Sequence, residues 1–448
     1  MNITPQFIDL MACPESGENL SLKDNQLVSQ QSKCHYPVIN GIPWLFRHPL
    51  HSMVDWSVKL NHFNQIFSDD IRQLKNELKK ASDYTQPRLE KLLSGKTLFQ
   101  QAVIELVSPI LSAKVASKPV YDALSDRAPH TQNLLSYEAN LYRDWVWGDE
   151  ENKLSAKIIM QRIGTLQPKN VLVLGAGSCR LAYDIHRLLG SATTIANDIN
   201  PLLLFAANKI LSGEALEIVE FPAHPINTES VALSHSIAGL EKWPDNFYLL
   251  FSDAATPAIK SAAIDLVVTP WLIDIQPFEL RKFMTCLNHY LPMGGHWVNF
   301  GSLVFNQSRE ALCYSIDEIK ALAHEAGFEI EESESQVIPY LKSPHNAGYR
   351  METVFSWRAR KVKEVKQTES LQNLPNWILD INKPIPATRE IQSFAFSHQL
   401  YAELAGKIDG KHSIVQIAKK IAREKSMDEQ EAISMVKNFY LKIIQESF

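Results

Sequence analysis

The chain has 448 residues, enough for two or three domains, and 45% of them are hydrophobic, which is ample for packed cores. The formal net charge of -5 and the pI near 6.3 provide no general attraction to nucleic acid, so neither RNA nor DNA is an expected partner. The sequence has no apolar run long enough to cross a bilayer, no secretory signal pattern and an odd number of scattered cysteines, which together predict free thiols and a cytoplasmic location without membrane attachment.

Residues 1–48 predict a small β module. A turn around Cys13 precedes a predicted hairpin, and residues 34–46 form an apolar segment that begins with Cys34 and His35. These segments resemble the Trm112-like domain, a zinc-ribbon-like β module that in many relatives binds and solubilises methyltransferases. A structural zinc site takes four ligands, usually in two close pairs, whereas this segment offers Cys13, Cys34 and His35. We therefore expect no metal, and a module that packs on a methyltransferase domain of the same chain.

Residues 49–150 carry apolar residues at helical spacing, as in residues 71–78 and 89–93, and end near Trp145 and Trp147. We expect this helical segment to cover a ligand pocket in the next domain, because a lid that excludes water strengthens electrostatic interactions inside a site. The alternative is a helical spacer that links two domains.

A nucleotide-binding pattern comes next. Residues 171–174 predict a buried strand, Gly175-Ala176-Gly177 a turn at which the backbone approaches a ligand, and residues 180–189 a helix. A second apolar strand, residues 193–196, leads to Asp198, where a carboxylate is placed to accept hydrogen bonds from both hydroxyls of a ribose. The pattern predicts a cofactor of the adenosine type.

Further strands extend this unit into a sheet. Residues 264–268 form another buried run, residues 292–300 read as a turn and a strand, and Asp253 supplies a second acid after an apolar stretch. Strands and helices in this order describe a doubly wound, Rossmann-like α/β sheet. Ligands bind beyond the carboxyl ends of such strands, where the glycine turn, Asp253 and Trp271 fall.

Six short segments between residues 135 and 360 carry a family resemblance. They are Arg143-Asp144-Trp145, Asn197-Asp198, residues 204–208, Leu272-Ile273-Asp274, Asn299-Phe300-Gly301 and Ala326-Gly327-Phe328. Together they resemble the class I S-adenosylmethionine-dependent methyltransferases and, within that class, the carnosine N-methyltransferase family. This family transfers a methyl group to an imidazole nitrogen of a histidine-containing dipeptide. The resemblance implies a class I methyltransferase sheet over residues 151–360 and S-adenosylmethionine as cofactor.

The resemblance also implies a cofactor site. Its residues are Arg143, Gly175, Ala176, Gly177, Arg180, Asp198, Ile199, Asp253, Ala254 and Trp271. Carried over position by position, Arg143 meets the methionine carboxylate, Asp198 the ribose and Asp253 the adenine amino group.

Asp274 is the residue that we expect to face the methyl acceptor, since it follows the apolar run 267–273 at a strand end. If one imidazole nitrogen donates its N–H to this carboxylate, the other is left bare and nucleophilic, and the carboxylate stabilises the cationic product. A methyl group on a sulfonium is already a strong electrophile, so alignment and a proton acceptor are the main requirements. The alternative for Asp274 is a helix N-cap, because Pro277 is placed to open the next helix.

Two departures from the family bear on the acceptor. Asn306 stands where the family has a histidine that contacts the imidazole, and Met351 stands at a tyrosine position, whereas Tyr349 is kept. Asp274, Asn306 and Tyr349 form the expected catalytic set, and Tyr340 is a further candidate to bind the substrate. The alternative for each tyrosine is a half-buried residue with its hydroxyl at the surface. Carnosine itself is not the expected substrate, but an imidazole or another neutral nitrogen fits Asn306, which both donates and accepts hydrogen bonds.

Cys179 is a third departure, at a position where the family usually has glycine. A side chain is sterically tolerated there if the backbone has a negative φ. Whether the thiol is inert or reactive stays open at this stage.

Residues 361–388 are charged and contain prolines, a composition typical of a linker. Residues 389–448 then carry apolar residues at helical spacing, broken at Asp409-Gly410 and at residues 426–428. They resemble PqqD-like, winged-helix-type domains, which implies capture of a leader peptide by β-strand addition beside a helix. The alternative is a helical dimerisation or stabilising cap.

Two functions are compatible with these patterns. The first is an S-adenosylmethionine-dependent N-methyltransferase acting on an imidazole-type nitrogen of a histidine-containing small molecule or peptide. The second is a catalytically weak cofactor-binding scaffold that assembles with a peptide or protein partner. The presence of Arg143, Asp198, Asp253 and Asp274 favours the enzyme, and no recognisable hydride-transfer site supports an NAD-dependent dehydrogenase.

Overall fold

The computed structural model describes residues 3–112, 133–190, 192–276, 279–306, 310–366, 384, 387 and 389–447. The chain divides into two compact units, Met1–Thr368 and Glu369–Phe448, and each is described by itself. Most of the expected linker 361–388 lies outside the described residues, as does Pro277.

The N-terminal module is a four-stranded antiparallel sheet preceded by a short helix. Its strands lie in chain order across the sheet. The elements are α1 (Pro5–Leu10), β1 (Ser21–Lys23), β2 (Gln26–Val28), β3 (His35–Ile39) and β4 (Ile42–Pro43). Asp24 and Asn25 connect β1 to β2 with positive φ, as expected for a tight hairpin between short strands.

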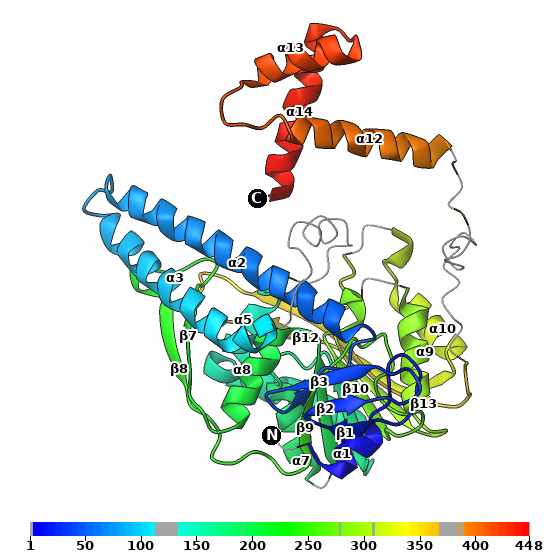
Figure 1. Cartoon of the computed structure of the whole chain (residues 1–448). Coiled ribbons are helices and arrows are strands. Elements are labelled where there is room, and N and C mark those ends of the chain that lie inside the picture. Colours follow the sequence, from blue (N-terminus) through cyan, green and yellow to red (C-terminus); the bar gives the residue numbers. More distant parts are fainter. Residues whose placement is uncertain are drawn as a thin grey trace. The chain divides into compact units, whose positions relative to one another are not determined.

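This module covers the outer edge of the large sheet, at strand β9 (Phe247–Phe251) (Figure 1). The residues after β4 run parallel to β9, where Trp44 pairs with Phe251 and the Leu45 N–H donates to the Phe251 carbonyl at 2.8 Å. The Phe7 ring stacks on the Tyr248 ring at 4.4 Å. An uncovered edge strand exposes unpaired backbone groups, so this docking protects β9.

Trp44→Ala is expected to lower the free energy of unfolding by about 3–5 kcal/mol, because a large buried ring is removed and the cavity collapses only in part. The Trp44 side chain is fully buried, packs 4.8 Å from the Phe251 ring and donates from Nε1 to Ser52 Oγ at 2.7 Å. Denaturant unfolding measures the change, with exposed Tyr84→Ala as the control that stays within about 0.5 kcal/mol of wild type. A loss below 1 kcal/mol in Trp44→Ala would mean that the module does not support the sheet.

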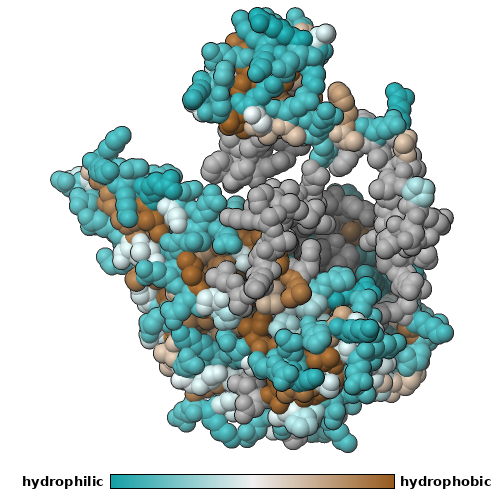
Figure 2. Space-filling view, in the orientation of Figure 1, coloured by the Kyte–Doolittle hydropathy of each residue, from teal (hydrophilic) through white to brown (hydrophobic). Residues whose placement is uncertain are grey.

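Two long helices form an antiparallel hairpin (Figure 1), α2 (Pro49–Leu78) and α3 (Gln86–Val107). Each begins with proline in its first turn, where the missing N–H has no helical partner to lose. Phe63 and Phe67 of α2 pack against Phe99 of α3, with ring centroids 6.0 and 5.3 Å away. Apolar side chains also show between polar ones on the surface of the hairpin (Figure 2).

After a 3₁₀ turn, Ser108–Ser112, the described chain resumes at residue 133 and forms three helical segments. They are α5 (Glu138–Tyr142), a π-helical turn (Arg143–Trp147) and α6 (Asp149–Ile163). The helical character expected for residues 49–150 is thus confirmed where the chain is described, while α6 extends it into the segment assigned to the next domain.

The large sheet has seven strands in the order β12-β13-β11-β10-β5-β6-β9. The five strands from β11 to β9 are parallel, and β13 runs antiparallel to both of its neighbours. The strands other than β9 are β5 (Asn170–Leu174), β6 (Thr193–Asp198), β10 (Leu266–Pro270), β11 (His296–Gly301), β12 (Phe328–Tyr340) and β13 (Arg350–Lys361). This sheet confirms the expected Rossmann-like α/β class and the closing hairpin.

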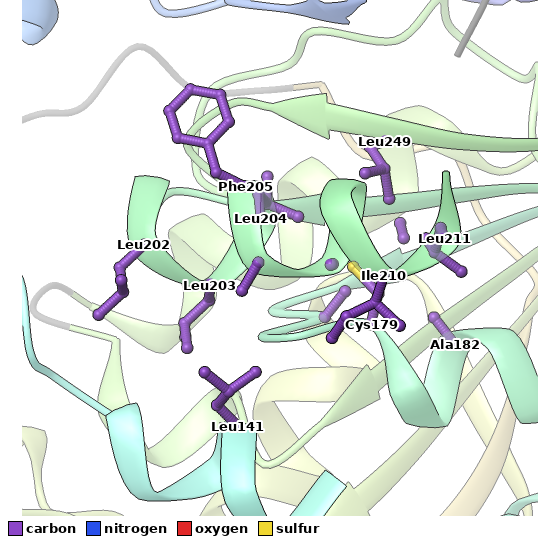
Figure 3. Close-up of a cluster of buried hydrophobic side chains, with 14 of the residues drawn as sticks. Leu141, Cys179, Ala182, Leu202, Leu203, Leu204, Phe205, Ile210, Leu211 and Leu249 are labelled. Atoms are coloured by element: carbon purple, nitrogen blue, oxygen red, sulfur yellow. The ribbon is translucent and has the colours of Figure 1, made fainter. Parts of the chain in front are cut away.

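Helices cover both faces of the sheet, as continuous apolar strands require. Besides α6 they are α7 (Arg180–Leu189), α8 (Pro201–Leu211), α9 (Leu280–Tyr290) and α10 (Ile316–Glu325). Helix α8 is apolar on nearly every side and correspondingly buried, as Figure 3 shows for residues 202–205, Ile210 and Leu211. Its start is fixed by Asn200, whose side chain accepts the Leu202 N–H.

One hairpin was not predicted from the sequence. Strands β7 (Leu216–Glu220) and β8 (Leu233–Ile237) form a separate two-stranded sheet between α8 and β9. Short 3₁₀ turns occur at Thr228–Ser230, Ile273–Ile275 and Glu310–Leu312. The hairpin contributes Glu220 and His235 to a polar cluster, in which His235 Nε2 lies 2.8 Å from Glu220 Oε2.

The second unit consists of α12 (Arg389–Ala405), α13 (Ile414–Lys425) and α14 (Glu429–Ser447). Leu404, Ile417, Ile421 and Val436 form its core. The helical spacing is confirmed, and the Ser413 capping box starts α13. No strand occurs among residues 384, 387 and 389–447, so the strand addition expected for a peptide has no counterpart within this described part.

In the parts of the chain given above, no helix combines the length and apolar character that a membrane crossing would need.

Candidate active site

The glycine turn lies between β5 and α7, at the carboxyl end of the sheet. Gly175 and Gly177 have φ values of 69° and 56°, in the left-handed region that favours glycine. A Cβ atom on Gly175 would lie 2.8 Å from Leu272 Cδ1, whereas one on Gly177 would meet open space. Gly175 is therefore required for packing and Gly177 for the turn itself, which leaves the backbone at Gly177 accessible to a ligand.

Asp198 ends β6 and holds the turn from the neighbouring strand. Its Oδ2 accepts the Gly177 N–H and its Oδ1 the Asn200 N–H, both at 2.8 Å. Burial raises the pKa of this carboxyl, while these backbone donors oppose the rise. Ala176, also buried, donates its N–H to the Asn197 carbonyl at 2.9 Å, so strand and turn are pinned at two adjacent points.

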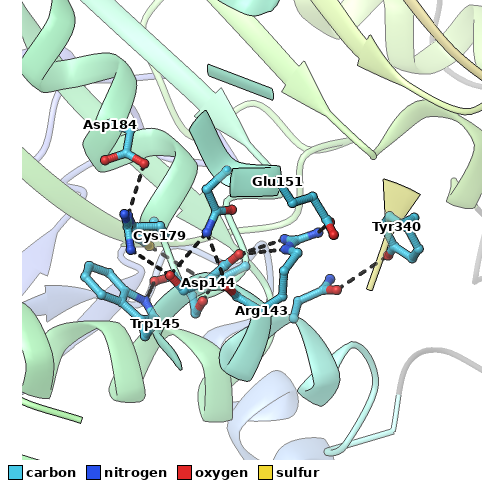
Figure 4. A network of polar contacts seen from close by, with 12 residues as sticks. Arg143, Asp144, Trp145, Glu151, Cys179, Asp184 and Tyr340 are labelled. Carbon is cyan, nitrogen blue, oxygen red and sulfur yellow. Dashed lines mark hydrogen bonds and ion pairs between the residues drawn. The ribbon is translucent and has the colours of Figure 1, made fainter. Parts of the chain in front are cut away.

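The π-helical turn Arg143–Trp147 packs directly on the glycine turn (Figure 4). Asp144 Oδ2 accepts from Ser178 Oγ at 2.5 Å, and Trp145 Nε1 donates to the Ser178 carbonyl at 2.9 Å. Asn152 Nδ2 donates to the carbonyls of Arg143 and Asp144 at 3.2 Å. Distortions of this kind within helices are frequent at functional sites, and here the turn carries Arg143 to the cofactor side of the sheet.

Arg143 is buried between two acids. Its Nη2 lies 2.8 Å from Asp144 Oδ1 and its Nη1 lies 3.5 Å from Glu151 Oε1. Burial disfavours the charge, but Asp144 outweighs it, with help from Glu151, and raises the pKa of Arg143. The guanidinium therefore stays protonated at every physiological pH.

Arg180, in the first turn of α7, contacts the π-helical turn Arg143–Trp147. It donates to the Asp144 carbonyl at 2.8 Å, forms ion pairs with Asp149 and Asp184, and lies over the Trp145 ring at 5.4 Å. Its contacts fix the turn that carries Arg143, so a supporting position fits it better than the direct cofactor contact expected from the sequence.

Asp253 and its neighbours follow β9, the strand next to β6. Asp253 is half-buried and its Oδ1 accepts the Ala255 N–H at 2.9 Å, which orients the carboxyl group, while the adjacent Ala254 is buried. Asn197 links the two strand ends by donating to Ser252 Oγ at 2.6 Å. Ile199 is half-buried beside Asp198, so the cofactor residues expected from β6 and β9 share one edge of the sheet.

Asp274 lies beyond β10, in the 3₁₀ turn Ile273–Ile275, and only 7% of it is exposed. Its Oδ2 accepts the Val304 N–H at 3.1 Å. Burial raises the pKa of this carboxyl to about 6, and the negative charge of Glu352 adds to the rise. The alternative of a helix N-cap is wrong, because α9 begins at Leu280 with Glu279 at its N-cap position.

Aromatic side chains flank Asp274. Trp271 has φ of 52°, and its N–H donates to the Phe300 carbonyl at 2.7 Å. Its ring lies 4.7 Å from the ring of Tyr340, which is buried at the end of β12 and donates to Asn140 Oδ1 at 3.4 Å. The guanidinium of Arg143 lies 5.8 Å from the Tyr340 ring, so Tyr340 contacts both Trp271 and Arg143.

Tyr137 belongs to the same surroundings and was missed by sequence reasoning. It has φ of 63°, and burial together with the charges of Tyr340, Asp274 and Asp198 raises its pKa to about 12. No sequence motif points to it, because its position depends on a chain reversal held by Asn200, which donates to the carbonyls of Leu134 and Ser136.

Asn306 and Tyr349 are not brought into this group by any contact of the described residues. Asn306 is exposed on the loop after β11, and Tyr349, 51% exposed, lies in the turn between β12 and β13 with Lys342 Nζ 5.3 Å from its ring. Both lie on loops that follow strand ends at the acceptor side of the sheet.

The condition of a negative φ at Cys179 is not met. Cys179 is the N-cap residue of α7 and has φ of 65°, in the left-handed region. Its side chain is fully buried next to Ala182, Ile210 and Leu211 (Figure 3), and burial raises its thiol pKa well above the usual value. A neutral, enclosed thiol is inert, so Cys179 packs rather than reacts.

The N-terminal module holds a hydrogen-bonded cluster where a zinc ribbon would hold metal. Cys13 Sγ lies 3.1 Å from Tyr36 Oη and 3.4 Å from Ser32 Oγ. Burial acts to raise the Cys13 pKa, but hydrogen bonds from Ser16, Ser32 and Tyr36 prevail and lower it to about 6. Over the described chain, no group of three or more His, Cys, Asp and Glu side chains is arranged to hold a metal ion.

The parallel sheet with its closing antiparallel hairpin, the glycine turn, and acids at the ends of two adjacent strands define the class: this is an S-adenosylmethionine-dependent methyltransferase fold. Residues 126–362, more than half of the chain, match the family described as carnosine N-methyltransferase. The chain therefore belongs to the carnosine N-methyltransferase family, and its cofactor is S-adenosylmethionine.

The chain is also similar to individual proteins, over part of its length. The carnosine N-methyltransferase of Dictyostelium discoideum is 26% identical over 186 residues, which cover 38% of this chain and 39% of the relative. Among solved structures, the N-methyltransferase NodS of Bradyrhizobium japonicum with S-adenosylhomocysteine is 13% identical with a TM-score of 0.34, covering 51% of this chain and 98% of that one. A methyltransferase of Bacillus halodurans is 12% identical with a TM-score of 0.34, covering 47% and 100%.

Proposed function

We propose that the protein transfers the methyl group of S-adenosylmethionine to an imidazole-type nitrogen of a histidine-containing small molecule or peptide. The family supports an imidazole acceptor, and Asp274 supports it independently. The observation that carries the proposal is a buried carboxylate beyond the end of β10 that is not an N-cap of α9 and accepts the backbone N–H of Val304. An ionised carboxylate offers about four acceptor sites, so Asp274 retains capacity for a substrate N–H.

The cofactor-holding residues are assigned by their positions. The open backbone at Gly177 lets the adenosyl group approach, Asp198 accepts the ribose hydroxyls, and Asp253 accepts the adenine amino group. Arg143 holds the methionine carboxylate with its protonated guanidinium. Trp271 and Tyr340 form an apolar wall that limits water at the point of transfer.

Bound S-adenosylmethionine supplies an electrophilic methyl group on a positively charged sulfur. Asp274 accepts the N–H of the acceptor ring, which leaves the second nitrogen bare and aims its lone pair away from Asp274. Methyl transfer to that nitrogen would break the carbon–sulfur bond of the cofactor and would leave the ring cationic. The Asp274 carboxylate stabilises this cation and takes up its N–H proton when the neutral methylated product leaves.

A substrate screen by mass spectrometry tests the proposal. The protein is incubated with S-adenosylmethionine and carnosine, histidine, thiolated histidine and a small histidine-containing peptide. The peptide is included because the second unit exposes the apolar side chains of Phe396, Tyr401 and Ile408. The expected result is one added methyl group on a ring nitrogen, lost when that nitrogen is blocked beforehand. Methylation of a carboxylate, thiol or amine with no ring product would contradict the proposal.

The value of kcat/KM is expected to rise with pH through about pH 6 and to level off above about pH 7. Asp274 must be ionised to accept the N–H, and its pKa is raised to about 6; a free imidazole acceptor must also lose its proton in this range. Glu352→Gln removes a negative charge that raises the Asp274 pKa. In this variant the rise of kcat/KM that is due to ionisation of Asp274 is expected to occur at lower pH. A profile that is flat between pH 5 and 8, or that falls with pH, would exclude Asp274 as the proton acceptor.

A further inference from the structure

Glu151, on the first turn of α6, is a buried carboxylate whose oxygens receive no well-aligned hydrogen bond from the described residues. Only 6% of the residue is exposed, and neither Oε1 nor Oε2 receives a hydrogen bond within the described structure. Buried carboxylates in folded proteins are almost always satisfied by donors, since burying a charge without them is costly. An unsatisfied pair of carboxylate oxygens at the edge of a ligand site therefore requires an explanation.

The negative charge of Glu151 is only partly balanced by the nearby positive charge of Arg143. Arg143 is its nearest positive group at 3.5 Å, but Arg143 directs both its Nε and its Nη2 to Asp144 Oδ1, at 2.9 and 2.8 Å. Among the described residues, one guanidinium thus faces two buried carboxylates, which leaves one negative charge in excess. Burial raises the pKa of Glu151, whereas Arg143 and the nearby backbone N–H groups of Lys342 and Leu341 oppose the rise and favour the ionised form.

The position of this carboxylate matches one end of the cofactor. Figure 4 shows Glu151 beside the Arg143 guanidinium, within the network that continues through Asp144 to the glycine turn. The methionine end of S-adenosylmethionine carries a carboxylate and an ammonium group on the same carbon atom. A guanidinium and a free carboxylate 3.5 Å apart present the complementary pair of charges at matching spacing.

We propose that Glu151 binds the α-ammonium group of the methionine end of S-adenosylmethionine while Arg143 binds the adjacent carboxylate. The site then recognises a zwitterion, and the excess negative charge of the empty site is neutralised by the ligand. This inference rests on the proposed function, since it takes the cofactor pocket as its starting point, and it adds a residue that sequence motifs did not indicate.

The competing interpretation is that Glu151 serves only as a structural counter-ion of Arg143. The two interpretations differ in the ligand-free protein. Removing one member of a needed buried ion pair destabilises strongly, so a structural role predicts that Glu151→Gln lowers Tm by more than about 5 °C. Removing a carboxylate that is unsatisfied until ligand arrives leaves Tm of the free protein unchanged or raised.

The test compares S-adenosylhomocysteine with its analogue that lacks the α-amino group, S-adenosyl-4-thiobutyrate, by calorimetric titration of the full chain. Wild type is expected to bind S-adenosylhomocysteine about 10- to 100-fold more tightly than the analogue, as for a hydrogen-bonded charge pair. Glu151→Gln is expected to lose most of this preference while binding the analogue as wild type does. The control Glu150→Gln removes the same charge from an exposed neighbour and is expected to match wild type.

Each outcome decides the inference. A wild-type preference below 3-fold overturns it without any variant, and so does a Glu151→Gln variant that weakens both ligands equally. If wild type binds neither ligand in the folded state, the proposed function falls together with the inference. If wild type binds S-adenosylhomocysteine and the analogue equally tightly, only the role of Glu151 is overturned, and the proposed methyltransferase function is unaffected.

Discussion

Asp274→Asn is expected to bind S-adenosylhomocysteine with wild-type affinity and to lose about 10²- to 10⁴-fold in kcat/KM for the imidazole acceptor, the range typical of a lost general base. The amide keeps the size of the side chain and an oxygen that accepts the Val304 N–H. It cannot take up the ring proton, and its neutral oxygen stabilises a cationic ring far less than a carboxylate does.

The comparison is made by initial rates with the acceptor found in the substrate screen, beside calorimetric titration of both proteins. Glu279→Gln serves as the control, since Glu279 is an acid a few residues along the chain that occupies the N-cap position of α9. The assignment of Asp274 would be refuted by wild-type turnover in Asp274→Asn. A parallel loss of cofactor affinity would place Asp274 in the cofactor site instead.

Asp198→Ala is expected to weaken binding of S-adenosylhomocysteine by about 100-fold or more, because two ribose hydroxyls lose a charged acceptor and each such hydrogen bond contributes about 1.5–3 kcal/mol. The substitution also frees the N–H groups of Gly177 and Asn200, which now hold the glycine turn in place. Calorimetric titration measures the change in Kd.

Asp245→Ala is the matched control for Asp198→Ala, since Asp245 is exposed on the approach to β9 and forms an ion pair with exposed Lys242. Thermal unfolding of each variant separates a binding defect from misfolding. Equal affinity for S-adenosylhomocysteine in wild type and a folded Asp198→Ala variant would show that Asp198 does not bind the ribose.

The central sheet was predictable because its signals are local. The strand at residues 171–174 is a continuous apolar run bounded by a glycine turn, and the helix Arg180–Leu189 starts and ends where the spacing indicates. The β7–β8 hairpin was missed because each strand has only five residues, and only β8 alternates between more and less exposed positions, whereas β7 is buried at all positions but Glu217. Such short alternation gives too weak a signal to separate a strand from a loop.

Other features depend on contacts between distant residues. The docking of the N-terminal module on β9 requires Leu45 to meet Phe251, and no local pattern encodes this pairing. The π-helical turn that carries Arg143 is fixed by Ser178 and Asn152 from other segments. Cys179 has left-handed backbone at the N-cap of α7, whereas N-cap residues are ordinarily extended, so no sequence rule indicated it.

The candidate site was predictable where chemistry coincides with a strand end, as for Asp198, Asp253 and Asp274. Glu151 escaped notice because it is the third of three consecutive acids at the start of a helix, a pattern that ordinarily reflects the helix dipole. Only its burial separates it from its exposed neighbours. Arg180 shows the reverse case, since its place beside the glycine turn suggested a ligand contact while its hydrogen bonds go to the protein.

Calorimetric titration of the wild-type protein with S-adenosylmethionine, S-adenosylhomocysteine and NAD tests the central claim most directly, because the cofactor site underlies every assignment made above. The account predicts that both adenosyl compounds bind, with one molecule per chain, and that NAD does not. Failure to bind either adenosyl compound, in protein whose thermal transition shows it to be folded, would contradict the account and favour a scaffold; binding of NAD alone would contradict it in favour of a dehydrogenase.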